Sequence, residues 1–158
     1  MVSLWRIATE TRQYRADDLS GSGAAKRPGR WNAEGQPIVY CAMSRSLAVL
    51  ETAAHLGDAG LPMNRYLIQI DIAPALWRKR LTLEPNDLDA AWNAIPAGRV
   101  SIHAGSKWLL GGRSALLLVP SVLVPEEQVA LINPAHPDAA AITAKTVRKF
   151  EYNLLFRA

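Results

Sequence analysis

Cysteine and histidine are scarce in this chain of 158 residues, and their scarcity argues against two kinds of site. The single cysteine, Cys41, cannot form an internal disulfide, and it lies in a predicted strand, where a buried apolar role is favoured over that of a nucleophile. The histidines His55, His103 and His136 are far apart in the sequence and lack ligand-type spacing to a second His or Cys. We therefore expect no metal site.

Long apolar runs, a signal peptide, repeats and low-complexity linkers are also absent from the sequence. Because no segment is long enough to cross a bilayer, we expect no membrane association and a cytoplasmic protein. A chain that is 49% hydrophobic can bury a sizeable core, which favours one domain over residues 1–158.

Signatures of nucleotide-phosphate loops and of DNA-binding modules are missing too. The chain has no Walker lysine loop, helix-turn-helix or zinc-finger spacing. Its formal net charge of +4 and pI near 9.5 suggest an anionic partner, which could be a nucleic acid, a dinucleotide or an acidic protein. The basic cluster Arg78-Lys79-Arg80 is typical of solvated surface. A nucleic-acid-binding module stays an alternative that rests on the basic charge alone.

One strand-to-helix passage carries the most distinctive side chains. The run Ile38–Cys41 predicts a strand, and Ser44 offers an N-cap for the helix that follows. Glu51 shares one face of that helix with three apolar residues, Leu47, Leu50 and Ala54. A carboxylate there is costly to bury unless a cation or several donors hold it, and Arg30 is the nearest candidate. A structural ion pair would account for Glu51 as well as a functional role would.

The other predicted elements mix strands and helices without a steady alternation, which favours an α+β fold. Strands are predicted at Leu4–Ala8, Arg65–Ile72, Ser114–Val119, Val129–Ile132 and Tyr152–Phe156. Helices are predicted at Asp87–Ile95, Ser101–Leu110 and Asp138–Lys149. Trp92 and Trp108 lie in apolar helical contexts and are expected in the core rather than as stacking platforms for bases. Residues Thr9–Gln36 are expected to form a long irregular connection of the kind that often carries function.

Several short motifs follow one another in a characteristic order. GRWN at 29–32 is followed by G-x-P-[IV]-V-Y ending at Tyr40 and by S-x-S-L-A-x-L-E ending at Glu51. Later come VPS, which ends at Ser121, then Pro125, and then INPAHPD at 132–138. In this order the motifs resemble the RES-domain family, the toxins of bacterial toxin and antitoxin pairs, and the resemblance covers nearly the whole chain.

The resemblance implies a central mixed sheet similar to that of ADP-ribosyltransferase toxins, with NAD as the substrate and no metal. It places Arg30, Tyr40, Glu51 and Ser121 in the active site. Glu51 would stabilise the developing positive charge on the ribose, and Arg30 would pair with the pyrophosphate. Tyr40 would stack on the nicotinamide ring or hold it by its hydroxyl, and Ser121 would donate to the ribose or the nicotinamide amide. Arg6 could meet a phosphate or the nicotinamide ribose, although an ordinary surface arginine is the alternative.

The resemblance also implies a partner, an Xre-type antitoxin that covers the active site, so that nucleic acid would be met only through the antitoxin. It leaves open whether ADP-ribose passes to a cellular protein, to water or to phosphate. We favour a mono-ADP-ribosyltransferase acting on a protein, with an NAD glycohydrolase or phosphorylase as the alternative. A third hypothesis is an interaction protein whose main activity is to pair with a helical antitoxin.

Overall fold

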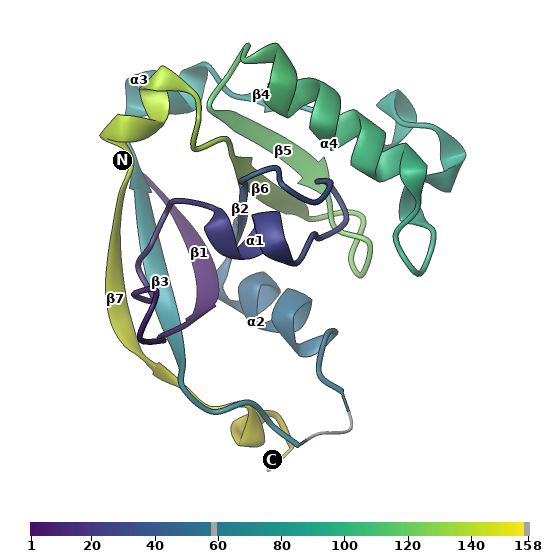
Figure 1. Ribbon diagram of the computed structural model, residues 1–158. Helices are drawn as coiled ribbons and strands as arrows, with labels where there is room; N and C mark the ends of the chain where they lie inside the picture. The colour runs from purple at the N-terminus through teal and green to yellow at the C-terminus, as the bar shows by residue number, and fades with distance from the viewer. Residues whose placement is uncertain (58–59, 157–158) are drawn as a thin grey trace.

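The computed structural model describes residues 1–57 and 60–156 (Figure 1). The chain begins with β1 (Val2–Thr9), α1 (Ser22–Lys26), β2 (Val39–Ala42), α2 (Arg45–Ala53), β3 (Arg65–Ile72) and α3 (Pro74–Arg78). It continues with β4 (Leu81–Thr82), the 3-10 helices η1 (Pro85–Asp87) and η2 (Ala90–Asn93), α4 (Arg99–Gly111), β5 (Leu116–Pro120) and β6 (Gln128–Ile132). It ends with η3 (Pro137–Ala141), β7 (Thr143–Phe150) and η4 (Tyr152–Phe156). Strands and helices are interspersed, so the predicted α+β class is confirmed.

A single mixed sheet of seven strands organises the molecule, in the order β4-β5-β6-β2-β1-β3-β7. Only β4 and β5 run parallel, and the other neighbours are antiparallel. β1 and β3 pair along their whole lengths, whereas β1 and β2 meet at the single pair Trp5 and Ala42. The sheet therefore consists of two well-paired parts joined at one point, with β1, β3 and β7 in one part (Figure 1).

Two apolar clusters lie on one face of this sheet, and a third fills the other face. Trp5 and Ala42 pack with Leu47 and Ala48 of α2, and Val129 packs with Trp108 of α4. Directly paired strand residues point to the same side, and Ala42 pairs with both Trp5 and Val129, so α2 and α4 cover the same face. The part of this face that lies between α2 and α4 carries the polar side chains described in the next subsection.

Most of the predicted elements are present. The strands at Leu4–Ala8, Ile38–Cys41, Arg65–Ile72, Ser114–Val119 and Val129–Ile132 and the helix at Ser101–Leu110 are confirmed within a few residues. Ser44 caps α2 by accepting a 3.1 Å hydrogen bond from the Leu47 amide, as predicted. Trp92 and Trp108 are buried, as expected of core residues. The long connection is irregular apart from α1.

Three predicted elements are wrong. Residues 138–149 form η3 and the edge strand β7 instead of a helix, because β7 pairs with β3 from Thr143 to Phe150. The expected strand 152–156 is η4, and the expected helix 87–95 is replaced by the last residue of η1 and the short 3-10 helix η2. Leu50 was expected on the buried face of α2 but is 44% exposed, since Leu47 and Ala48 make the contacts with the sheet.

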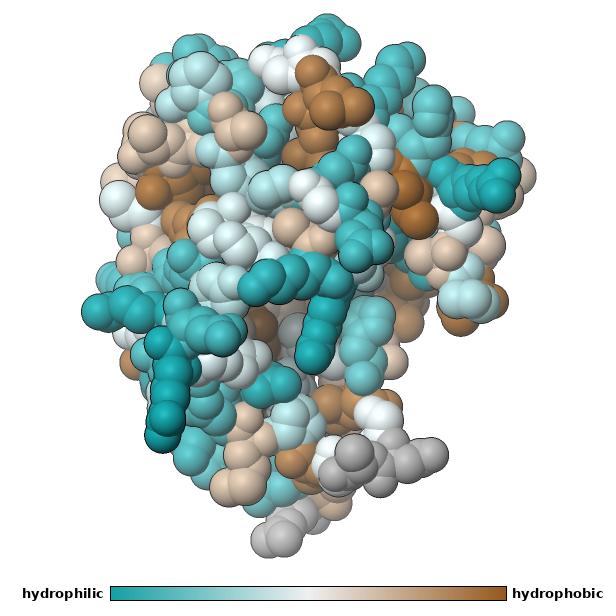
Figure 2. Space-filling view, in the orientation of Figure 1, coloured by the Kyte–Doolittle hydropathy of each residue, from teal (hydrophilic) through white to brown (hydrophobic). Residues whose placement is uncertain are grey.

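The surface over α1 and the segment before it is mainly hydrophilic, and the hydrophobic residues visible there form small separate patches (Figure 2). No helix in the described ranges has the length and apolar character needed to span a membrane.

Candidate active site

The segment that carries Arg30 is pressed between the sheet and α4. Gly29 lies against the Tyr40 ring so closely that a Cβ on Gly29 would come within 2.7 Å of the ring. On the other side, a Cβ on Gly105 of α4 would lie 1.7 Å from the carbonyl oxygen of Trp31. Trp31 is itself buried and stacks on Trp92, with ring centroids 6.3 Å apart. These contacts fix the backbone on both sides of Arg30.

Arg30 is hydrogen-bonded to η2 and to the residue that follows it. Its Nη1 donates to the carbonyl oxygens of Trp92 at 3.1 Å and Ala94 at 2.7 Å. Burial lowers the pKa of Arg30, while the nearby Glu51 carboxylate and Tyr40 phenol act in the opposite direction. Within the described residues its Nε and Nη2 groups have no protein acceptor. These are donors of the planar fork that can bind an oxyanion in two places.

Tyr40 lies in β2 with its hydroxyl already engaged. The hydroxyl accepts a hydrogen bond from the Trp31 amide at 2.9 Å and donates to Oδ1 of Asn32 at 2.7 Å. Burial is the main cause of a pKa for Tyr40 well above its ordinary value. The phenol is therefore neutral at physiological pH, and it ties β2 to the segment that carries Arg30.

Glu51 and Ser121 meet although they are far apart in the sequence. The Ser121 hydroxyl donates to Oε1 of Glu51 at 2.5 Å, a short bond of the kind formed with a carboxylate. The same Ser121 oxygen accepts from the amides of Leu123 and Val124, each at 3.1 Å. Ser121 is buried and follows β5 directly, whereas Glu51 is partly exposed on α2. The serine therefore fixes one carboxylate oxygen, and the other oxygen has no hydrogen-bond partner among the described residues.

The expected ion pair between Arg30 and Glu51 is replaced by a longer-range attraction. No direct contact of these two groups occurs among the ion pairs of residues 1–57 and 60–156. The direct partner of the carboxylate is Ser121 instead. Arg30, Tyr40, Glu51 and Ser121 are thus brought together between α2 and α4, as a group that combines one cation, one carboxylate and two hydroxyls.

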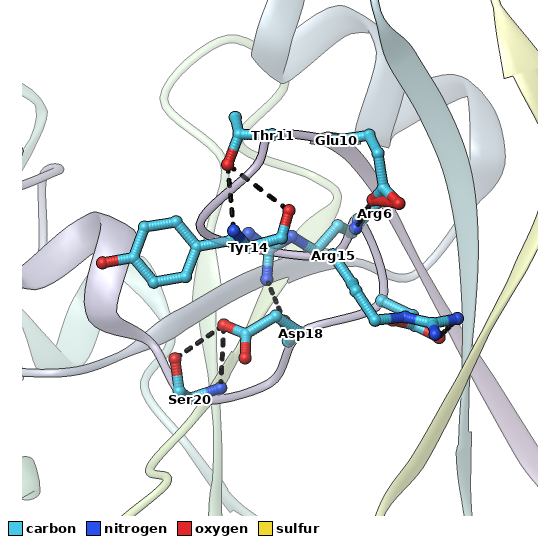
Figure 3. Close-up of polar contacts among 9 residues, drawn as sticks. Arg6, Glu10, Thr11, Tyr14, Arg15, Asp18 and Ser20 are labelled. Atoms are coloured by element: carbon cyan, nitrogen blue, oxygen red, sulfur yellow. Dashed lines mark hydrogen bonds and ion pairs between the residues drawn. The ribbon is translucent and has the colours of Figure 1, made fainter.

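Arg6 lies away from this group. Trp5 points toward α2, so its neighbour Arg6 points to the opposite face of the sheet. Its Nη1 lies 3.4 Å from the carbonyl oxygen of Asp18, in the polar segment that follows β1 (Figure 3). Arg6 also lies near Cys41, which is buried as predicted and whose pKa is raised by burial to about 12. The thiol therefore stays protonated at physiological pH.

A hollow of about 360 Å³ opens beside Ser121, at the turn between β5 and β6. It is lined by Met43, Pro120, Pro125, Gln128 and three glutamates, Glu84, Glu126 and Glu127. The carboxylates make this hollow unfavourable for an anionic group. For metals, the described part of the chain contains no cluster of three or more His, Cys, Asp or Glu side chains suited to holding an ion.

Sequence reasoning missed two residues that shape the site. Asn32 is fully buried and bonded to Tyr40, and the only signal was its place at the end of GRWN. Gly105 lies inside a helix, where an isolated glycine often marks a close approach of another backbone.

Comparison with known proteins supplies the family. The model of the RES domain matches residues 3–154. This chain is a member of the RES-domain family. A "Prs ADP-ribosylating toxin" from Sphingobium sp. (strain YBL2) is 56% identical over 151 residues, which cover 96% of this chain and 94% of the relative. A "Toxin Res" from Yersinia enterocolitica is 39% identical over 133 residues, or 84% of each chain. A "Toxin Res" from Photorhabdus laumondii is 36% identical over 142 residues, or 90% of this chain and 88% of the relative. The predicted resemblance of this RES-domain protein to a toxin family is confirmed.

Proposed function

We propose that this RES-domain protein is a toxin that cleaves the nicotinamide to ribose bond of NAD and transfers ADP-ribose to a cellular protein. The observation that carries the proposal is the Glu51 carboxylate, held at Oε1 by Ser121 and lying near Arg30, whose Nε and Nη2 have no acceptor among the described residues. The toxin names of the relatives support it, and the Sphingobium relative is named as an ADP-ribosylating toxin. The NAD-binding domain would comprise residues 1–158.

Cleavage of the nicotinamide to ribose bond requires one carboxylate from the protein and no acid for the leaving group. Nicotinamide leaves from a cationic pyridinium and takes the electron pair of the broken bond, so it becomes neutral without a proton. Glycosidases use a second carboxyl group as an acid for the leaving group, and that task is absent here. What remains is stabilisation of the oxocarbenium-like ribose, a role that we assign to the Glu51 carboxylate. The acceptor then forms the new bond at the ribose carbon and releases its proton.

Each of the other groups has a role that its contacts allow. The Nε and Nη2 donors of Arg30 would bind the pyrophosphate, because the carboxylates of the neighbouring hollow disfavour it there. Tyr40 would present its ring to nicotinamide while its hydroxyl holds the Arg30 segment. Ser121 would orient Glu51, since its one proton is donated to that carboxylate. Arg6, which lies on the other face of the sheet, is left out of the proposed site.

Replacing Arg30 should weaken NAD binding. We expect Arg30→Ala to raise the dissociation constant on the order of tenfold or more, because a charged hydrogen-bonding partner of the pyrophosphate is lost. Arg30→Lys keeps the charge but not the fork, so its affinity should lie between alanine and wild type. Calorimetric titration with NAD measures both. Unchanged affinity in a folded Arg30→Ala protein would move the phosphate contact to another residue.

The acceptor can be identified with two assays. The purified chain incubated with NAD should release nicotinamide, which separates an enzyme from a nucleic-acid-binding module or a purely interacting protein. NAD labelled in the adenylate part should then mark one protein of a bacterial lysate. Release of nicotinamide with free ADP-ribose or its phosphate ester, and no labelled protein, would identify an NAD glycohydrolase or phosphorylase instead.

An enzyme of this kind, made in the cytoplasm, would harm the cell that produces it. We therefore propose a cognate Xre-type antitoxin that covers the active site. A carboxylate or chain terminus of that partner would compete with NAD for Arg30. Induction of the chain alone should arrest growth, and co-expression of the neighbouring gene should restore it. If soluble, folded protein accumulates without slowing growth, the toxin proposal is wrong.

A further inference from the structure

The side chain of Asn32 occupies the centre of the segment that carries Arg30. Asn32 is fully buried, and its Oδ1 accepts from the Gly29 amide at 2.8 Å and from the Tyr40 hydroxyl at 2.7 Å. Its Nδ2 donates to the carbonyl oxygens of Ala24 at 2.9 Å and Gln36 at 3.0 Å, with a longer contact to Ala33 at 3.3 Å. A buried amide whose oxygen and nitrogen are both fully used admits one arrangement of the groups around it.

These bonds bracket Arg30 on both sides. The residue before it, Gly29, is bonded directly to Asn32. The residue after it, Trp31, is bonded through its amide to the Tyr40 hydroxyl, which in turn donates to Asn32. Neither amide takes part in the backbone hydrogen bonds of a helix or strand, because Gly29 and Trp31 both lie in an irregular segment. In addition to the packing contacts of Gly29 and Trp31, the direction in which the Arg30 side chain leaves the backbone therefore depends on the side-chain amide of Asn32.

We infer that Asn32 is a positioning residue, which sets Arg30 toward the ligand by fixing the backbone amides on either side of it. The inference rests on the proposed function in so far as Arg30 binds NAD. It also gives the Tyr40 hydroxyl a definite task. Its proton goes to Asn32 and its oxygen accepts from Trp31, so the hydroxyl acts as a link between β2 and the Arg30 segment.

The test compares two buried asparagines in the full chain. Asn32→Ala removes the link, whereas Asn133→Ala is the matched control. Asn133 is 2% exposed, donates to the Leu109 carbonyl and accepts from the Ala135 amide, and among the described residues it has no hydrogen bond to the Arg30 segment. Hydrogen exchange of a peptide covering residues 28–34 reports the Gly29 and Trp31 amides without requiring any activity. NAD affinity measured by calorimetry reports whether Arg30 is still positioned to bind NAD.

We expect Asn32→Ala to speed exchange of the 28–34 peptide on the order of tenfold, since hydrogen bonds that protect its amides are lost. NAD affinity should fall on the same scale as in Arg30→Ala. The double variant Asn32→Ala/Arg30→Ala should bind no more weakly than Arg30→Ala alone, because both changes remove the same contact. Asn133→Ala should leave both the 28–34 exchange and the affinity at wild-type values, even if it lowers the melting temperature.

Unchanged exchange in folded Asn32→Ala would overturn the inference, and so would equal effects in Asn133→Ala, which would indicate general loosening. Additive losses in the double variant would also overturn it. If Arg30→Ala leaves NAD affinity intact, the proposed role of Arg30 fails, while the exchange result still decides whether Asn32 holds the segment. Should Asn32→Ala not fold, Tyr40→Phe removes only the hydroxyl link. Faster 28–34 exchange with weaker NAD binding in that variant supports the inference, and wild-type values contradict it.

Discussion

Glu51→Gln should leave a folded protein that has lost most of its NAD cleavage, with kcat lower by about a hundredfold or more. The amide keeps the shape of the side chain and an oxygen that can accept from Ser121, so the 2.5 Å contact has a neutral equivalent. What disappears is the negative charge opposite the oxocarbenium-like ribose. Nicotinamide release under saturating NAD measures the loss. The growth arrest expected on induction should disappear with it.

The control is a glutamate of the same type away from the site. Glu151 is exposed and follows β7, so Glu151→Gln should keep wild-type turnover. Thermal unfolding of both variants shows whether either change disturbs the fold. Turnover within a few-fold of wild type in folded Glu51→Gln protein would mean that Glu51 is a structural residue and that the proposed mechanism is wrong.

Gly105→Ala should destabilise the protein, although alanine is the better helix former. Propensity alone would favour alanine by about 1 kcal/mol. The new Cβ would lie 1.7 Å from the Trp31 carbonyl oxygen and 2.6 Å from its carbon, so α4 or the Arg30 segment must move. Overpacking of this kind costs roughly 1–3 kcal/mol or more. We expect a melting temperature lower by about 5 °C and weaker NAD binding, because the displaced backbone is next to Arg30.

The same helix supplies the matched control. A Cβ on Gly111 would meet no heavy atom within 4 Å, so Gly111→Ala should be neutral or slightly stabilising. Urea unfolding of the two variants gives their free energies of unfolding directly. Equal stability of Gly105→Ala and Gly111→Ala would show that the contact between α4 and Trp31 is not tight in solution.

Local sequence patterns correctly predicted the elements whose own preference agrees with the structure that they adopt in the sheet. Alternating apolar residues at Arg65–Ile72 and the cap at Ser44 act within a few residues, and both predictions are confirmed. Residues 138–149 are different, because four alanines, Lys145 and Lys149 favour a helix locally. Pairing with β3 outweighs that preference, and this partner is more than seventy positions away. A local sequence pattern does not specify a strand partner at that distance along the chain.

The residues of the candidate site also separate into those that a local motif predicts and those that depend on distant contacts. Arg30, Tyr40 and Glu51 fall within one strand-to-helix passage, and the sequence pointed to them as a group. Ser121 was reached only through the family resemblance, since its contact with Glu51 spans 70 positions. The roles of Tyr40 and Ser121 were predicted as contacts to the ligand, but their hydroxyl protons are donated to Asn32 and Glu51. Which acceptor a hydroxyl selects depends on packing that no short motif specifies.

The distance along the chain between Glu51 and Ser121 also determines when the site can assemble while the ribosome makes the chain. A ribosome that has made residues 1–120 has supplied Arg30, Tyr40 and Glu51 but not the hydroxyl that orients the carboxylate. The sheet is also unfinished at that stage, because β6 lies between β5 and β2 and follows Ser121. A nascent or prematurely terminated chain would thus lack an assembled site. Under the proposed function, NAD cleavage would therefore begin only after the chain has been made past β6.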